Sequence, residues 1–416
     1  MADRQLAGRI LKPAPNNFVE RPWGGTRLRE FKTLCPLPDQ IELTGSGIGE
    51  SFEIAAFDAD EEAARYPSRV RTTAGWMPLT QLVRDHGETL LGERWISRYG
   101  RSIPLLPKFL NVRELLSVQG HPPGHTEAYI VISADPGATI RLGFRRDIKA
   151  ADFHRTLEAG LQAQRDLVAL LGEDSPWFAV QRLLAQWFSD RGKESADMLA
   201  SLSETCQNAM TGRAGVRVRN LLEALKVTYW FVLDSMNEVP LEPGQVIHNT
   251  NPQRIVDLHS RQPAAEVHAL GNPLKREFVM LEIRRPGPTL RAWDNVRFPL
   301  RDVDIGAALK VLNLQATAAE EFTCSRAPLE TERHSLSVES PYFRIEHVDL
   351  SGGDSVSLGS DRAHCLHMLA GSADLETDEG LVELRAGESA FVPFGVGSFR
   401  ATASAQGMQL VRVFLP

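Results

Sequence analysis

Three potential metal ligands, Gln119, His121 and Glu127, lie within nine residues of one another. Gln119 and His121 stand two positions apart, so on a β-strand both side chains leave the same face of the sheet. Glu127 follows the turn-forming sequence Pro-Pro-Gly at 122–124 and precedes the apolar run 128–132, which predicts the returning strand of a hairpin. A hairpin would bring an amide oxygen, an imidazole and a carboxylate to one cation. His121 alone fits a hydrogen-bonded structural histidine, but the mixed set without a thiolate favours catalytic zinc, or a harder divalent ion.

The composition bounds the class of protein. With 416 residues the chain has room for two or three domains, and its 43% hydrophobic and 24% charged residues are ordinary for globular proteins. A net charge of −7 argues against a nucleic-acid partner. No signal sequence and no apolar run near the roughly 20 residues that span a bilayer are present, which argues against a membrane partner and predicts a cytoplasmic protein. Four cysteines without a Cys-x-x-Cys pair fit reduced thiols: Cys35, Cys206, Cys324 and Cys365.

The chain divides into β-rich ends around a helical block. Short runs punctuated by Pro and Gly predict strands up to about residue 146 and again from 238, whereas apolar residues recur every three or four positions in between. After about residue 320, short strands separated by Gly and Asp turns predict a sandwich or small barrel. Helices are expected over 78–92, 150–171, 174–188, 193–210 and 216–236.

The ligand segment also resembles a known family. Leu-Leu-Ser-Val-Gln-Gly-His-Pro at 115–122 and His-Thr-Glu-Ala-Tyr-Ile-Val at 125–131 resemble Leu-Ser-Val-Gln-Val-His-Pro and Lys-Thr/Pro-Glu-x-Trp-Tyr of class I mannose-6-phosphate isomerases. These are zinc enzymes built from cupin-type β-barrels. Weaker motifs of the same family occur in the family's order before and after it, at 21–25, 49–53, 107–110 and 136–144.

The resemblance implies a mainly β fold with a helical insert. We expect two cupin-type, jelly-roll-like β-barrels and an α-helical subdomain at 147–237. The catalytic barrel would comprise 1–146 and 238–318, and a C-terminal cupin-like barrel would comprise 319–416. In that second barrel, 387–398 has the Gly-x5-Pro-x-Gly-x2-His spacing of a cupin motif, but Ser398 stands at the histidine position. We therefore expect no metal in the C-terminal barrel, with His364 and His367 as ordinary barrel residues.

The resemblance also implies a fourth ligand, His268. Val-His-Ala-Leu-Gly at 267–271 resembles the family's Val/Pro-His-Ala-Ile-Gly. The family usually places Pro-Gly-Asp about a dozen residues before this histidine, whereas here Gly244 of Pro-Gly-Gln stands 24 residues before it. His248 and His259 lie in the intervening segment and remain alternatives for this position. One Zn²⁺ per chain would then be held by Gln119, His121, Glu127 and His268.

Further along, 282–294 resembles the family's Glu-Ile-Gln-Gln-x-Ser-Asp-x-Thr-Tyr-Arg-Leu-Tyr-Asp. By that match Glu282 contacts the sugar in the active-site cavity, and Arg291 stabilises a developing enediolate or holds the substrate. Lys108 would add positive charge near the metal, and Ser117 would meet a phosphate. The general base stays open between Glu282, His125 and a metal-bound hydroxide.

Two departures lie close to the ligands. His125 replaces the lysine that the family usually places two residues before the metal-binding glutamate, and Tyr129 shifts the family's Trp-Tyr pair. The resulting prediction is a monomeric zinc-dependent aldose–ketose isomerase that interconverts mannose 6-phosphate and fructose 6-phosphate through a cis-enediol. The alternatives are a same-fold isomerase of another sugar phosphate and a non-catalytic sugar-binding cupin.

Overall fold

The computed structural model describes most of the chain, namely residues 6–14, 17–32, 47–57, 59, 61–73, 75–172, 177–189, 212–250, 266–296, 300–331, 333–359 and 361–416. The helix expected over 193–210 lies outside these residues, as do Cys35, Cys206 and His259. Strands predominate, and the main helices fall between residues 150 and 235. The mainly β class with a helical insert is therefore confirmed.

Two sheets pack face to face in the middle of the molecule. Their facing side chains share one apolar core, to which Leu110, Tyr129 and Met280 contribute from one sheet and Ile140 and Leu142 from the other. The larger sheet has the order β1 (Phe18–Gly25), β2 (Ile48–Phe52), β5 (Lys108–Val112), β12 (Phe278–Arg284), β7 (Glu127–Ala134), β10 (Val246–His248) and β14 (Thr323–Cys324). The smaller has the order β13 (Leu290–Trp293), β6 (Val118–Gly120), β11 (His268–Ala269), β8 (Thr139–Phe144) and β9 (Met236–Pro240).

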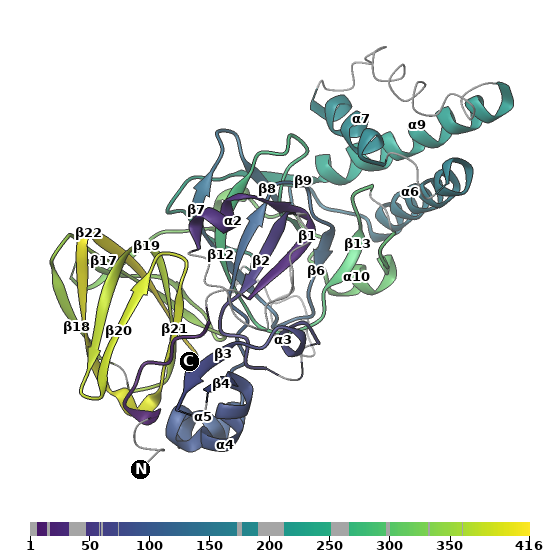
Figure 1. The fold of residues 1–416 in the computed structure, drawn as a ribbon. Coiled ribbons are helices and arrows are strands. Elements are labelled where there is room, and N and C mark those ends of the chain that lie inside the picture. Colours follow the sequence, from purple (N-terminus) through teal and green to yellow (C-terminus); the bar gives the residue numbers. More distant parts are fainter. Residues whose placement is uncertain are drawn as a thin grey trace.

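Three helices form a second core at one end of the paired sheets (Figure 1). They are α6 (Ala150–Leu171), α7 (Trp177–Ser189) and α9 (Gly212–Ser235), and they pack with the short helix α10 (Ile305–Val311) and with Trp293 of β13. α6 ends at Gly172, whose φ of 83° suits glycine, as the sequence predicts. α4 (Leu79–Leu91) matches the helix expected over 78–92, and α5 (Glu93–Tyr99) follows it.

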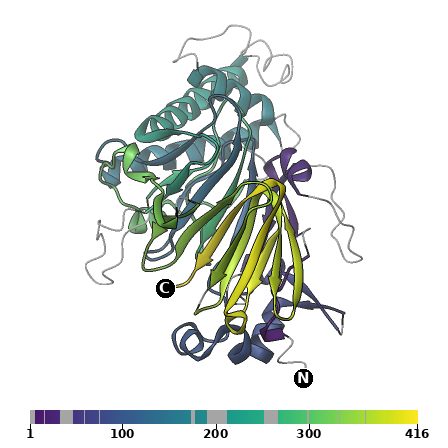
Figure 2. The same ribbon diagram turned by 90° about the vertical axis from the view of Figure 1, so that its left-hand side faces the viewer.

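The C-terminal part forms a separate sheet on another side of the paired sheets (Figures 1 and 2). It packs on the larger sheet, where Phe109, Ile130 and Leu281 share a core with Val411 and Phe391. The larger sheet is thus buried on both faces, which explains its nearly continuous apolar strands. The strand order is β15 (Ala327–Thr331), β16 (His334–Glu339), β17 (Arg344–Leu350), β22 (Ser398–Phe414), β19 (His364–Thr377) and β20 (Gly380–Arg385), with β18 (Ser355–Gly359) on β22 and β21 (Ser389–Val392) on β19.

A buried polar cluster joins the C-terminal sheet to the rest of the molecule. Ser389 donates to the carboxylate of Glu53 at 2.8 Å, and that carboxylate also pairs with Lys32. His367 bonds Ser389 through Nδ1 at 2.8 Å, so it has a structural partner inside the protein. Over the described residues, no helix has the length and apolar character required to span a membrane.

Candidate metal centre and active site

The strands that carry Gln119 and Glu127 lie in different sheets, and His121 directly follows the first of them. Gln119 is the middle residue of β6, and Glu127 opens β7. β6 pairs with β11 and β13, whereas β7 pairs with β12 and β10. The predicted hairpin is therefore wrong. The prolines at 122–123 lack the N–H groups that a paired strand needs, and the chain crosses here from one sheet to the other, so the side chains meet across the interior.

The predicted fourth ligand, His268, lies beside Gln119. The two residues are opposite one another in the β11–β6 pair, and their Nε2 atoms are 3.2 Å apart. Nε2 of His121 lies 2.8 Å from Oε1 of Glu127, and Nε2 of His268 lies 3.5 Å from Oε2 of the same carboxylate. The ligand atoms of His121, Glu127 and His268 all lie within 4.8 Å of one another, and all three side chains are buried. The fold thus brings the four predicted ligand residues together.

Backbone carbonyls orient both imidazoles toward the centre of this group. Nδ1 of His121 donates to the carbonyl oxygen of Pro288 at 3.0 Å, and Nδ1 of His268 donates to that of Glu266 at 3.1 Å. With its proton on Nδ1, each ring carries a lone pair on Nε2. With its proton on Nδ1, the buried Nε2 of His121 has no hydrogen to share with Oε1 of Glu127, its neighbour at 2.8 Å. Two such lone pairs beside a carboxylate form a donor set that fits zinc.

Burial and neighbouring charges set the protonation of the same groups. Burial lowers the pKa of His268 to about 4, so its ring is neutral at pH 7. Burial alone would raise the pKa of Glu127, but His121, His268 and Arg284 outweigh it and hold that pKa well below its ordinary value. A neutral imidazole and an ionised carboxylate are the forms that bind a metal ion.

Gln119 is placed with its amide nitrogen toward His268. Its Oε1 instead accepts a hydrogen bond from Oγ of Ser117 at 2.7 Å. Metal binding through the amide oxygen therefore requires the amide to turn over, after which Ser117 would accept from the NH₂ group. A hydroxyl suits either arrangement because it both donates and accepts.

A cavity of about 90 Å³ lies beside the ligand group. Strand pairing places Lys108 opposite Glu282 and places Arg291 opposite Gln119. Nζ of Lys108 lies 3.5 Å from Oε1 of Glu50. Except for His121, which is not among the lining residues, every predicted site residue lines this cavity: Lys108, Ser117, Gln119, Glu127, His268, Glu282 and Arg291.

Glu282 has an unusual acid strength in this cavity. Burial, together with the charge of Glu127, raises the pKa of Glu282 to about 8, although Lys108 and Arg284 act in the opposite direction. Near neutral pH both its protonated and ionised forms are therefore accessible. A carboxyl group in that state can act as a general acid or a general base.

The stability of the metal-free protein should therefore depend on Glu282. Its pKa is higher in the folded chain than its ordinary value of 4.5, so the folded state binds the proton more tightly. The stabilisation is complete below pH 4.5 and is lost as the pH rises through 8, with a slope of at most about 1.4 kcal/mol per pH unit. In urea unfolding of chelator-treated protein, Glu282→Gln should remove this decline. Glu158→Gln, which changes an exposed glutamate on α6, is the control, and parallel pH curves for Glu282→Gln and wild type would contradict the assignment.

His248 and His125 make their contacts outside the ligand group. Nε2 of His248 bonds Oγ1 of Thr126 at 2.8 Å, and His248 is not part of the three-residue cluster. His125 does not line the cavity; its ring lies against Gly287, where a Cβ atom would stand 2.1 Å from Nδ1. His259 falls outside the described residues. Among these alternatives, the geometry thus favours His268.

Several residues of the site were not predicted. Tyr129 and Asn249 both donate to Oε2 of Glu127, and Arg284 approaches Oε1 of the same side chain to 3.7 Å. Tyr129 could have been found from the alternation of strand β7, because it lies two residues after Glu127 and so shares its face. Asn249 gives no such signal, since it reaches Glu127 through the pairing of β10 with β7. Arg21, Glu50 and Arg301 also line the cavity.

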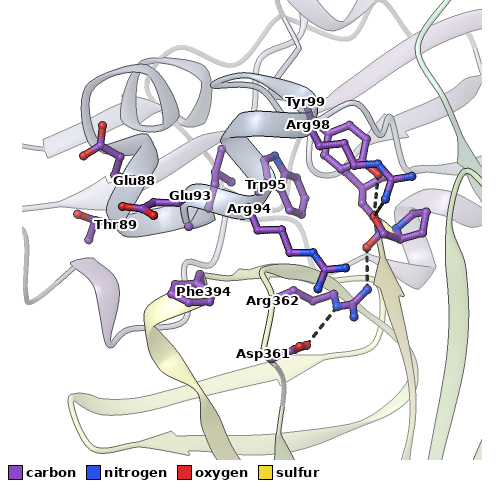
Figure 3. Close-up of a pocket in the computed structure, with 14 residues that line it drawn as sticks. Glu88, Thr89, Glu93, Arg94, Trp95, Arg98, Tyr99, Asp361, Arg362 and Phe394 are labelled. Carbon is purple, nitrogen blue, oxygen red and sulfur yellow. Dashed lines mark hydrogen bonds and ion pairs between the residues drawn. The ribbon is translucent and has the colours of Figure 1, made fainter.

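A larger cavity, of about 500 Å³, lies elsewhere, between α4, α5 and the C-terminal sheet (Figure 3). Arg94 and Trp95 line it from the helix side, and Arg362 and Phe394 line it from the sheet side. Arg98 donates to the carbonyl oxygen of Pro416 at 2.7 Å, which ties the two sides together. None of the candidate metal ligands lines this cavity, so the chemistry is assigned to the smaller one.

Comparison with known proteins identifies the fold. No protein-family profile and no curated protein sequence matches the chain. Among solved structures, 97% of the chain superposes on 98% of mannose 6-phosphate isomerase from Bacillus subtilis, with a TM-score of 0.62 and 16% identity. A variant of phosphomannose isomerase from Salmonella typhimurium gives 0.62 and 18% over 97% of this chain and 99% of that one. A mannose 6-phosphate isomerase bound with zinc and yttrium gives 0.60 and 18% over 97% and 98%.

These identities are low, but the alignments cover nearly the whole of each chain and the TM-scores are well above the level of chance. They therefore establish the architecture independently of the short motifs found in the sequence. The chain has the fold of the mannose-6-phosphate isomerases.

Proposed function

We propose that the protein is a zinc-dependent aldose–ketose isomerase that interconverts mannose 6-phosphate and fructose 6-phosphate through a cis-enediol. The observation that carries the proposal is the buried group of His121, Glu127 and His268 at the edge of a charged cavity. The structural neighbours support this choice, because they are isomerases of this sugar phosphate and one of them is bound with zinc.

The metal would be one zinc ion per chain, held by Gln119, His121, Glu127 and His268. When bound, zinc would supply a Lewis acid for the oxygens of an open-chain sugar. The protein's own contribution is to hold the ligands in place through the carbonyl groups behind both imidazoles, and to keep Glu127 ionised. Its cavity walls provide the remaining groups.

Those groups suit a proton transfer between adjacent carbons. Glu282 lines the cavity, and in the metal-free protein burial raises its pKa to about 8. We propose that its carboxyl group accepts a proton from one carbon and returns it to the next. Arg291 and Lys108 would stabilise the negative charge that develops on the enediolate. Ser117 would contact the phosphate, with the cavity arginines nearby. His125, the other side chain considered as a base, does not line the cavity.

The architecture proposed with this function has two cupin-type barrels. The catalytic barrel would comprise 1–146 and 238–318, with a helical subdomain at 147–237 and a C-terminal barrel at 319–416 that serves as support. Ser398 opens β22 and is exposed, and within the described residues the C-terminal sheet contributes no group of three or more His, Cys, Asp or Glu side chains that could hold a metal. We propose a cytoplasmic monomer that binds a small sugar phosphate.

A panel of sugar phosphates tests the substrate assignment. The zinc-loaded protein is incubated with mannose, glucose, ribose and arabinose phosphates, and the ketose or aldose product is measured by a coupled assay. Mannose 6-phosphate should have the highest kcat/KM. A higher value for another sugar phosphate would support the same-fold alternative, for which the replacement of the family's lysine by His125 is the motivating observation. No turnover of any of them would overturn the proposed activity.

A further inference from the structure

The two carboxylate oxygens of Glu127 have different surroundings. Oε1 faces Nε2 of His121 at 2.8 Å and lies 3.7 Å from Nε of Arg284. Oε2 accepts hydrogen bonds from the hydroxyl of Tyr129, at short distance, and from Nδ2 of Asn249 at 3.2 Å, and it lies 3.5 Å from Nε2 of His268. A carboxylate oxygen has two lone pairs, so these two donors use the hydrogen-bonding capacity of Oε2 in the plane of the group.

From this asymmetry we infer that Tyr129 and Asn249 are positioning residues that make Glu127 a one-oxygen ligand, which binds the metal through Oε1. The inference rests on the metal site of the proposed function but not on the identity of the substrate. The motifs in the sequence do not explain why the polar side chains of Tyr129 and Asn249 are buried. Holding the metal-binding carboxylate of Glu127 in position would explain it.

The strands fix both donors rigidly. Tyr129 lies two residues after Glu127 on β7, so its side chain leaves the same face of the sheet. Asn249 directly follows β10, which pairs with β7, and it is tied to Glu127 a second and third time: its Oδ1 accepts from the N–H of Glu127, and its own N–H donates to the carbonyl of Glu127, both at 2.9 Å. Backbone and side chain of Glu127 are therefore held by the same neighbour.

Burial makes these bonds consequential. Tyr129 is fully buried and Asn249 is 1% exposed, so water does not replace a donor that is removed. With the phenol oxygen gone, Oε2 would keep one donor, and the carboxylate could rotate to present both oxygens to the metal. Partners of this kind behind a ligand typically change metal affinity about 10- to 100-fold. Tyr129 also stands where the family motif has tryptophan, which has no hydroxyl group. The hydrogen bond from a tyrosine hydroxyl to the glutamate is therefore a feature of this chain and not of the motif.

The test uses zinc alone, without substrate. The dissociation constant of zinc is measured by competition with a chromophoric chelator for wild type and Tyr129→Phe. We expect a rise of about 10- to 100-fold for Tyr129→Phe. Tyr229→Phe is the matched control, because Tyr229 is equally buried but lies on α9, and its zinc affinity should not change. An affinity of Tyr129→Phe equal to that of wild type would overturn the inference.

The visible spectrum of bound Co²⁺ reports the coordination number of the metal, which general destabilisation of the protein would not change. If Glu127 becomes a two-oxygen ligand in Tyr129→Phe, the coordination number of bound Co²⁺ rises, and the intensity of its visible d–d bands should fall relative to wild type. Unchanged bands would contradict the inference even if the affinity fell.

A crystal structure of the zinc-loaded wild type tests directly whether Glu127 binds the metal through one oxygen, without any variant. It should have Oε1 of Glu127 on the metal and Oε2 on Tyr129, and a chelating glutamate would overturn the inference. Because these measurements need no turnover, their failure is separate from failure of the isomerase assay.

Discussion

Replacement of His121 by alanine, or of Glu127 by glutamine, should leave purified protein with only a small fraction of the one zinc ion per chain expected for wild type. His121→Ala removes a ligand atom, and Glu127→Gln removes the negative charge that attracts the cation to this buried group. Turnover of mannose 6-phosphate should fall together with the zinc content, and the fall should not be reversed by modest zinc excess. Metal analysis by mass spectrometry and the coupled assay, on the same preparations, provide the measurement.

Two other histidines supply the controls. His248→Ala removes a buried ring close to the site, and His259→Ala changes the other candidate for the fourth position. Both should retain zinc, although His248→Ala should lose some stability because its bond to Thr126 is buried. Loss of zinc in either one, with retention in His268→Ala, would show that the fourth ligand is assigned to the wrong histidine.

Arg291→Ala should lower kcat by about 10²-fold or more, the scale seen when one donor to a developing oxyanion is lost. Arg291 lies on β13 opposite Gln119 and lines the cavity, but it is not a metal ligand. An interaction made only in the transition state lowers kcat and kcat/KM together, so KM should change little. Zinc content should stay near that of wild type.

The conservative change refines this prediction. Arg291→Lys keeps the charge but not the planar pair of donors, so it should recover only part of the rate. Arg155 is an exposed arginine on α6, and Arg155→Ala should leave both kcat and KM unchanged. Near-wild-type turnover of Arg291→Ala with full zinc would remove Arg291 from the catalytic residues.

The sequence predicted the components of the site better than their connections. Gln119, His121 and Glu127 are close in the chain, so their types and spacing were sufficient to propose a metal. Their arrangement was not predictable in this way: the turn at 122–124 crosses between sheets, and the hairpin interpretation depended on local pairing alone. The approach of His268 to Gln119 depends on pairing between residues 149 positions apart, for which the family resemblance was the guide.

Helices were predictable from the sequence because their signals are local, whereas features that depend on strand pairing were not. α4 and α6 were predicted because apolar spacing and the glycine after α6 are local signals. The raised pKa of Glu282 and the approach of Asn249 to Glu127 arise from burial and from the pairing of β12 and β10 with β7. Such features belong to the assembled sheets, and a single strand sequence does not contain them.

The central claim is that one zinc in this cavity supports isomerisation, and a metal titration tests it most directly. Protein freed of metal by a chelator, then returned to chelator-free buffer, is titrated with zinc while the conversion of mannose 6-phosphate to fructose 6-phosphate is followed. The account predicts negligible turnover without metal and activity that rises linearly to a plateau at one zinc per chain. Full turnover by verified metal-free protein, or a zinc-saturated protein that converts no sugar phosphate, would contradict it.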